Sequence, residues 1–136
     1  MTIFVDSSFL IALFHKADEF HSKAQKINEE IKKNRSLRLL TSNIVIAETV
    51  NFIFRLGGPG VAKKFLTIVK ETGLETVFLL PEFFDSAYVL LFRQKSKRGL
   101  NFFDCLHLAT MKFFSVDTIL TFDKGFCREV KVIGVN

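Results

Sequence analysis

Acidic side chains interrupt the most apolar parts of this sequence at four separate places. Asp104 follows a pair of phenylalanines, and Asp123 ends the apolar run Ile-Leu-Thr-Phe. Two more acids, Asp6 and Glu48, lie among similarly apolar neighbours. Because an ionised carboxylate without a partner is costly to remove from water, each of these acids needs either a stabilising neighbour or a function.

Three of the four acids also have an ordinary structural explanation. The spacing Asn101-x-x-Asp104 resembles a capping box at a helix start. Asp6 can cap the helix that follows it with its own side chain, and Asp123 precedes Lys-Gly, as a turn residue commonly does. Only Glu48 has no such explanation, since it lies in mid-helix, and we therefore expect its partner to come from the tertiary structure.

The elements that must position these acids alternate between strands and helices. Apolar runs predict buried strands at residues 2–5, 37–41, 75–80, 117–122 and 130–135. Helical spacing of apolar residues predicts helices at 7–16, 18–34, 42–56, 61–72, 81–92 and 102–114, with a glycine-rich break at 57–60 and a short turn or helix after residue 123.

Strands separated by helices, with continuous rather than alternating apolar residues, indicate the α/β class. In that class a parallel sheet is covered by helices on both faces. Asp6 and Asp123 each follow a predicted strand, and ligands bind such sheets beyond the carboxyl ends of the strands. We therefore expect these two acids to share one cleft with Asp104 and Glu48.

Four carboxylates in one cleft repel one another, which raises their pKa values unless a cation is present. Ligands that are all oxygen, without a Cys or His cluster, favour Mg²⁺ or Mn²⁺. Such an ion at a sheet edge usually serves phosphate chemistry, because it polarises a phosphoryl oxygen and activates water. The pattern predicts a metal site with that chemistry.

The bulk composition fits one compact domain with a polyanionic partner. The chain has 136 residues, of which 49% are hydrophobic, with only 7 Gly and 2 Pro, and we treat residues 1–136 as a single domain. No apolar run approaches the roughly 20 residues that a bilayer requires, so we expect a cytoplasmic protein with no membrane association. The net charge of +5 suits a nucleic acid, although lysine-rich solvated helices also explain it.

Four segments together resemble PIN-domain ribonucleases, especially VapC-like toxins of prokaryotic toxin–antitoxin pairs. The segments are FVDSSFLIALF, TSNIVIAETVNFI, GLNFFDCLHLATM and ILTFDKGF, in the order and spacing of the family. The resemblance implies a three-layer α/β/α PIN-like domain with a mainly parallel central sheet. It also implies a Mg²⁺- or Mn²⁺-dependent endoribonuclease whose catalytic and metal-binding residues are Asp6, Glu48, Asp104 and Asp123.

The resemblance also suggests polar side chains that support this site. Ser7 or Ser8 is expected to hold either Asp6 or a metal-bound water. The Thr121 hydroxyl matches a position that contacts the acidic cluster. The chain departs from many members at two positions: Asn101 replaces a Ser or Thr, and Gly125 replaces a further acid. The second departure leaves open whether one or two metal ions bind.

His107 lies one helical turn after Asp104, which leaves two interpretations open. It either faces the cleft and contacts substrate or, as is more common for a lone His on an apolar helix face, is a hydrogen-bonded core residue.

The resemblance implies three partners: an RNA substrate, a VapB-like antitoxin and a second copy of the chain in a homodimer. Two other functions stay open at this point. One is a catalytically inactive PIN-like RNA-binding or scaffold module. The other is a metal-dependent phosphatase with an Asp nucleophile, which would typically need an acid where Ser8 stands.

Overall fold

The computed structural model describes residues 1–135, in which strands and helices alternate along the chain. The strands are β1 (Thr2–Val5), β2 (Arg38–Ser42), β3 (Leu74–Val77), β4 (Thr118–Leu120) and β5 (Lys131–Ile133). The helices are α1 (Ser7–Phe14), α2 (His21–Lys33), α3 (Asn43–Glu71), α4 (Pro81–Arg93) and α5 (Phe102–Phe113), with a 3₁₀ helix η1 (Lys124–Arg128) before β5.

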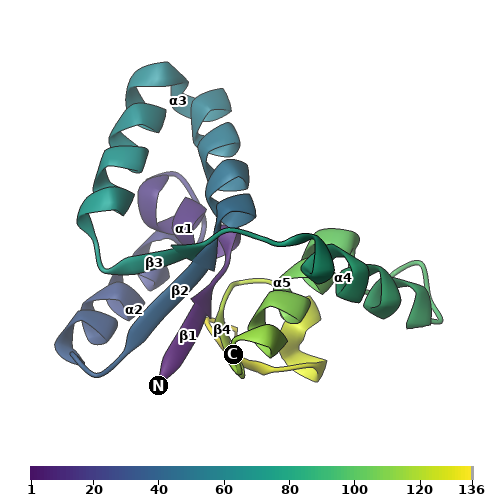
Figure 1. The fold of residues 1–136 in the computed structure, drawn as a ribbon. Helices are drawn as coiled ribbons and strands as arrows, with labels where there is room; N and C mark the ends of the chain where they lie inside the picture. Colours follow the sequence, from purple (N-terminus) through teal and green to yellow (C-terminus); the bar gives the residue numbers. More distant parts are fainter. Residues whose placement is uncertain (136) are drawn as a thin grey trace.

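All strand pairs are parallel, in the order β3-β2-β1-β4-β5. Figure 1 shows β3, β2, β1 and β4 side by side. The central strand β1 places Phe4 between Leu40 of β2 and Ile119 of β4. The chain moves outward from β1 to β2 and β3 on one side, and through β4 to β5 on the other. The strand order therefore reverses beside β1, which is where ligands bind in sheets of this kind.

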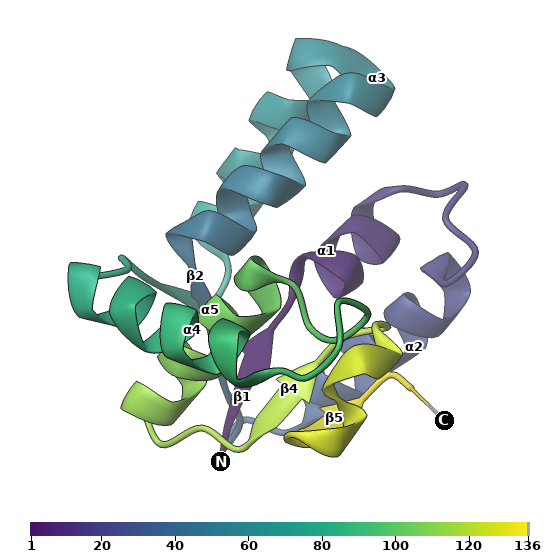
Figure 2. The ribbon, with the colours of Figure 1, turned by 90° about the vertical axis from the view of Figure 1, so that its right-hand side faces the viewer.

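Helices lie on both faces of the sheet, so the predicted three-layer α/β class is confirmed. Figure 2 shows α4 and α5 on one side of β1 and α1 with α2 on the other. The main apolar core includes the β1 residues Ile3, Phe4 and Val5, each at most 1% exposed. A second cluster lies between α4 and α5.

The two helices predicted at 42–56 and 61–72 are both present as the two halves of α3, and the predicted break between them lies at Gly58. Ser42 begins it by accepting a hydrogen bond from the backbone N–H of Val45. Only Gly58 leaves the helical conformation, with φ 81° and ψ −173°, and Pro59 then starts the second half, where its missing N–H costs nothing. Figure 1 shows the helix reversing direction at this kink.

By length and composition α3 is also apolar enough to cross a membrane, which contradicts the expectation that no segment would be. One such helix is weak support for a membrane span, because core helices of soluble proteins meet the same criterion. The kink at Gly58 leaves neither half near the roughly 20 residues that a straight span needs.

Several predicted elements are shorter in the structure, for local reasons. The helix predicted at 18–34 begins at His21, because the Asp18 carboxylate accepts the Phe20 N–H in a turn. The strand predicted at 75–80 ends at Val77. The strands predicted at 117–122 and 130–135 pair only over three residues each, and Gly134, with φ 115°, turns the chain after the last one.

Candidate active site

The structure brings the four predicted acids to the carboxyl edge of the sheet, each on a different element. Asp6 follows β1 and Asp123 follows β4, while Asp104 lies in the first turn of α5 and Glu48 in the first half of α3. Strand ends and helix starts meet at this edge because every strand is parallel.

Asp6 is buried, with 6% exposure, and is held by two hydroxyl groups. Its Oδ2 accepts hydrogen bonds from Ser8 Oγ at 3.0 Å and Thr121 Oγ1 at 2.7 Å. The backbone N–H groups of Phe122 and Asp123 donate to these same two hydroxyl oxygens, which also lie within hydrogen-bond distance of each other, at 3.0 Å. Each hydroxyl group can therefore direct its proton either to Asp6 or to the other hydroxyl group. No side-chain cap bond reaches the α1 backbone, and the explanation of Asp6 as a helix cap is therefore wrong.

Glu48 has the tertiary partner that its position required. Ser7 Oγ, in α1, donates to Glu48 Oε2 at 3.0 Å. Of the two serines expected to hold Asp6, only Ser8 does so, while Ser7 contacts the carboxylate of α3 instead.

For Asp104 the capping-box explanation is confirmed, and for Asp123 the turn explanation is confirmed. Asp104 and Asn101 form a complete capping box, in which Asp104 Oδ2 accepts the Asn101 N–H at 3.1 Å. Asp123 Oδ1 accepts the Gly125 N–H at 2.8 Å and begins η1. Each of these bonds occupies only one oxygen of the carboxylate, so a structural role leaves the other oxygen available.

Each of the four carboxylates has one oxygen that accepts a hydrogen bond and one that accepts none. The oxygens that accept no hydrogen bond from residues 1–135 are Asp6 Oδ1, Glu48 Oε1, Asp104 Oδ1 and Asp123 Oδ2. Four such oxygens are the donor type that Mg²⁺ or Mn²⁺ prefers. In this described part of the chain, however, no three Asp, Glu, His or Cys side chains are spaced closely enough to hold an ion as they stand. The donor chemistry fits a hard cation, although the side chains lie farther apart than an ion requires.

The environment of Asp104 disfavours its ionised form. Burial is the main cause that raises the pKa of this carboxyl to about 6, and the hydrogen bond from the Asn101 N–H opposes that rise. The negative charges of Asp123, Asp6 and Glu48 make smaller contributions to the same raised pKa. The other three acids therefore lie near enough to Asp104 to act on its charge.

The sequence profile of the PIN domain matches residues 3–131. The chain belongs to the PIN domain family.

Solved structures support the same family for this PIN domain. VapC20 of Mycobacterium tuberculosis, described as a Sarcin-Ricin loop cleaving toxin, superposes with a TM-score of 0.82 and 25% identity over 98% of both chains. A toxin–antitoxin complex from Klebsiella pneumoniae gives 0.71 and 16% over 96% of this chain and 95% of that one. VapBC2 from Rickettsia felis, bound to a DNA fragment from its promoter, gives 0.73 and 14% over 98% of both. The similarity to the structures from Klebsiella pneumoniae and Rickettsia felis shows a shared fold. No curated protein matches significantly in sequence.

His107 of the PIN domain corresponds to neither interpretation made from the sequence. It is 2% exposed, which excludes substrate contact, and it packs against the Phe4 ring at 5.5 Å. Its Nε2 lies 3.7 Å from Asp6 Oδ1, and its Nδ1 has no hydrogen-bond partner among the described residues, so it is not a satisfied core residue either. Burial lowers the His107 pKa, against the opposing charges of Asp6 and Glu48. A neutral, buried imidazole therefore lies next to the Asp6 carboxylate.

A pocket lined by charges of both signs adjoins the acids, and the sequence did not single it out. Its volume is about 560 Å³, and the charged residues that line it are Arg98, Asp104, Asp123, Lys124, Arg128 and Glu129. We use the name basic pocket for this space, after its three cations, although the three carboxylates balance their charge. The sequence showed the basic residues, but only the fold brings the 94–101 loop beside η1.

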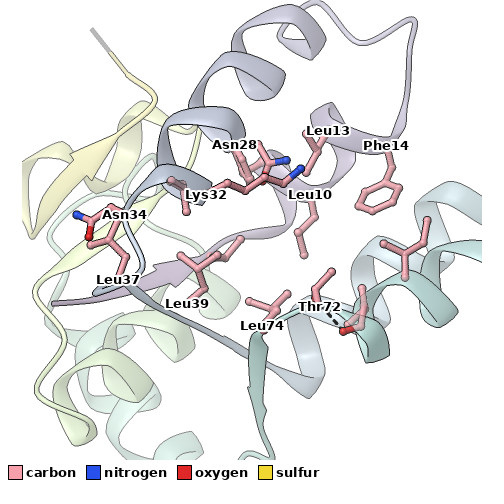
Figure 3. Close-up of a pocket in the computed structure, with 16 residues that line it drawn as sticks. Leu10, Leu13, Phe14, Asn28, Lys32, Asn34, Leu37, Leu39, Thr72 and Leu74 are labelled. Atoms are coloured by element: carbon pink, nitrogen blue, oxygen red, sulfur yellow. Dashed lines mark hydrogen bonds between the residues drawn. The ribbon is translucent and has the colours of Figure 1, made fainter.

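A second cavity, of about 500 Å³, lies away from the acids between α1, α2, β2 and the end of α3 (Figure 3). Its lining is mostly apolar and includes Leu10, Leu39 and Leu74. None of the four acids lines it, so its shape has no part in the acidic site.

Replacing Asp104 by Asn should stabilise the PIN domain at neutral pH in the absence of divalent ions. The folded pKa of about 6 lies above the ordinary value of 3.8, so the unfolded chain loses this proton first as the pH rises. Wild-type stability is therefore lost between about pH 4 and 6, while the amide of the variant cannot ionise and still accepts the Asn101 N–H. The thermal unfolding midpoint of the variant should rise relative to wild type across this window.

The matched control is Asp85→Asn, at an exposed residue of α4, whose unfolding curve should follow that of the wild type. Parallel curves for Asp104→Asn and wild type from pH 4 to 7 would contradict the raised pKa of Asp104.

Proposed function

We propose that this PIN domain is a Mg²⁺- or Mn²⁺-dependent endoribonuclease, the toxin of a toxin–antitoxin pair. Its proposed catalytic and metal-binding residues are Asp6, Glu48, Asp104 and Asp123. The observation that carries the proposal is that four carboxylates lie at one sheet edge, three of them near enough to act on the charge of Asp104, and that each keeps one oxygen free of hydrogen bonds. The likeness to VapC20, a toxin that cleaves the Sarcin-Ricin loop, supports RNA as the substrate.

A divalent ion held by these oxygens would polarise the phosphodiester and lower the pKa of an attacking water. The chain itself keeps the oxygens in place. Ser8 and Thr121 fix the orientation of Asp6, Ser7 fixes Glu48, and the capping box with Asn101 fixes Asp104 at the start of α5. Polar neighbours of this kind are worth about 10- to 100-fold in metal affinity or activity.

The proposed partners are inferred from the similar solved structures and from the exposed side chains of this chain. Complexes of toxin with antitoxin are among the similar structures, which supports a VapB-like antitoxin and a cytoplasmic location. Large aromatic side chains are exposed on α3, α4 and the segment between β3 and α4, and these suit protein contacts, including a homodimer. They are Phe52, Phe54, Phe78, Tyr88 and Phe92.

Removing divalent ions tests the proposal directly. The purified chain should cleave single-stranded or hairpin RNA in Mg²⁺ or Mn²⁺, and EDTA should abolish the cleavage until metal is restored. Fragment ends are read by sequencing, and metal binding is followed by calorimetry. Cleavage that persists in EDTA would contradict metal dependence, whereas metal binding without cleavage would favour an inactive RNA-binding module.

A further inference from the structure

We infer that the basic pocket binds a phosphate of the RNA strand adjacent to the phosphate that is cleaved. Arg98, Lys124 and Arg128 would be the positioning residues. The inference rests on the proposed function and adds to it, because it makes the substrate a strand with phosphates on more than one nucleotide.

The position of the basic pocket is the first support. Asp104 and Asp123 belong both to the acidic site and to the wall of the pocket, so the two are continuous. A volume of about 560 Å³ lies within the usual range for ligand pockets, roughly 300–1,000 Å³, and accommodates a nucleotide. A group bound there lies directly beside the acids.

The charges in the basic pocket are available for an anion. Among the described residues, Arg98, Lys124 and Arg128 form no ion pair, although Asp104, Asp123 and Glu129 line the same space. Several exposed cations elsewhere do pair, as Lys131 does with Asp117 at 3.1 Å.

Both segments that carry these cations are held in place. The loop before α5 is closed by Gln94, whose side chain donates to the Leu100 carbonyl at 2.7 Å and accepts the Leu100 N–H at 2.6 Å. The N–H of Arg98 donates to Ser96 Oγ at 3.1 Å. On the other side, Asp123 begins η1, which carries Lys124 and Arg128. A pre-formed frame reduces the entropy cost of binding a phosphate.

A nucleic acid strand suits this arrangement better than an acidic protein segment. Phosphates recur regularly along a strand, so one can lie at the acidic site while the next meets the cations. Arginine binds phosphate through two parallel N–H groups, and lysine adds a point charge. A peptide carboxylate would gain nothing from the neighbouring acids.

The test compares two triple variants of the full chain with the same net charge. Arg98→Gln/Lys124→Gln/Arg128→Gln removes the cations of the basic pocket, and Lys63→Gln/Lys64→Gln/Lys70→Gln removes three exposed lysines of α3. Affinity for a short fluorescent single-stranded RNA is measured by anisotropy in EDTA, over a series of KCl concentrations. Circular dichroism checks that both variants fold.

The pocket variant should bind at least about tenfold more weakly, and the slope of log Kd against log salt should fall by about 0.7, the contribution of one neutralised phosphate on a single strand. The α3 variant should bind as wild type does. An unchanged slope in the pocket variant, or no RNA binding by the wild type, would overturn the inference. So would loss of affinity only for a polyglutamate probe, which would assign the pocket to an acidic protein segment.

Because the binding assay contains no metal, its result is independent of cleavage. If the wild type cleaves RNA and the pocket variant binds RNA as the wild type does, the proposed role of the pocket is rejected while the proposed nuclease activity stands. Weaker RNA binding by the pocket variant, without cleavage by the wild type, would reject the nuclease and leave an RNA-binding pocket.

Discussion

Replacing Asp6 by Asn should lower the rate of metal-dependent RNA cleavage about a thousandfold or more, which corresponds to a loss of about 4 kcal/mol in transition-state stabilisation. Asp6 is the most buried of the four acids, and its Oδ1 accepts no hydrogen bond among the described residues. The amide oxygen of Asn can still accept from Ser8 and Thr121, so the fold should persist. The amide nitrogen, however, offers no lone pair to a cation.

The rate constants for Asp6→Asn and wild type are measured in Mn²⁺ under single-turnover conditions. Asp85→Asn on α4 makes the same chemical change at an exposed position outside the site and should keep wild-type activity. Near-wild-type cleavage by a clean preparation of Asp6→Asn would remove this acid from the proposed catalytic set.

Replacing Gly134 by Ala should destabilise the domain and disturb the site together. Gly134 has φ 115°, where an L-residue costs about 1–3 kcal/mol, and its added Cβ would press on the backbone carbonyl of Thr121. The Thr121 hydroxyl holds Asp6, so a shift of this backbone also moves the carboxylate. We expect a lower free energy of unfolding in urea and a reduced cleavage rate in the fraction that remains folded.

Gly60→Ala is the matched control, since its added Cβ would meet no heavy atom within 4 Å and the residue lies inside α3. Its stability should stay the same or rise by up to about 1 kcal/mol, because Ala favours a helix. Equal unfolding energies for Gly134→Ala and wild type would contradict the described turn after β5.

The order of the strands and helices was predictable because it depends on patterns within a few residues. The apolar run Thr-Ile-Phe-Val predicts a buried strand and forms β1. The apolar residues that follow at helical spacing predict a helix and form α1. The ends of elements were less predictable. Residues 57–60 contain three glycines and a proline, any of which can end a helix, yet only Gly58 departs from helical geometry. Packing of the second half of α3 against the core, through Phe65, favours this short reversal.

The candidate acids were found from the sequence because a lone carboxylate among apolar residues is visible without a structure. The local bonds of Asp104 and Asp123 were predictable too, since each partner lies within three residues. The sequence could not show that Asp6 is held by Thr121 rather than capping its own helix, because those two residues are 115 positions apart.

By itself, then, the sequence determined the class of the fold, the order of its elements and the acids proposed to carry out the chemistry. Only the tertiary structure decided that His107 is buried next to Asp6 and that Ser7 donates a hydrogen bond to Glu48. It also decided that cations from two separate segments line one pocket. The physical reason is the range of the interactions. Hydrophobic periodicity and capping act between neighbours in the chain, whereas these contacts exist only once the sheet has brought distant segments to the same edge.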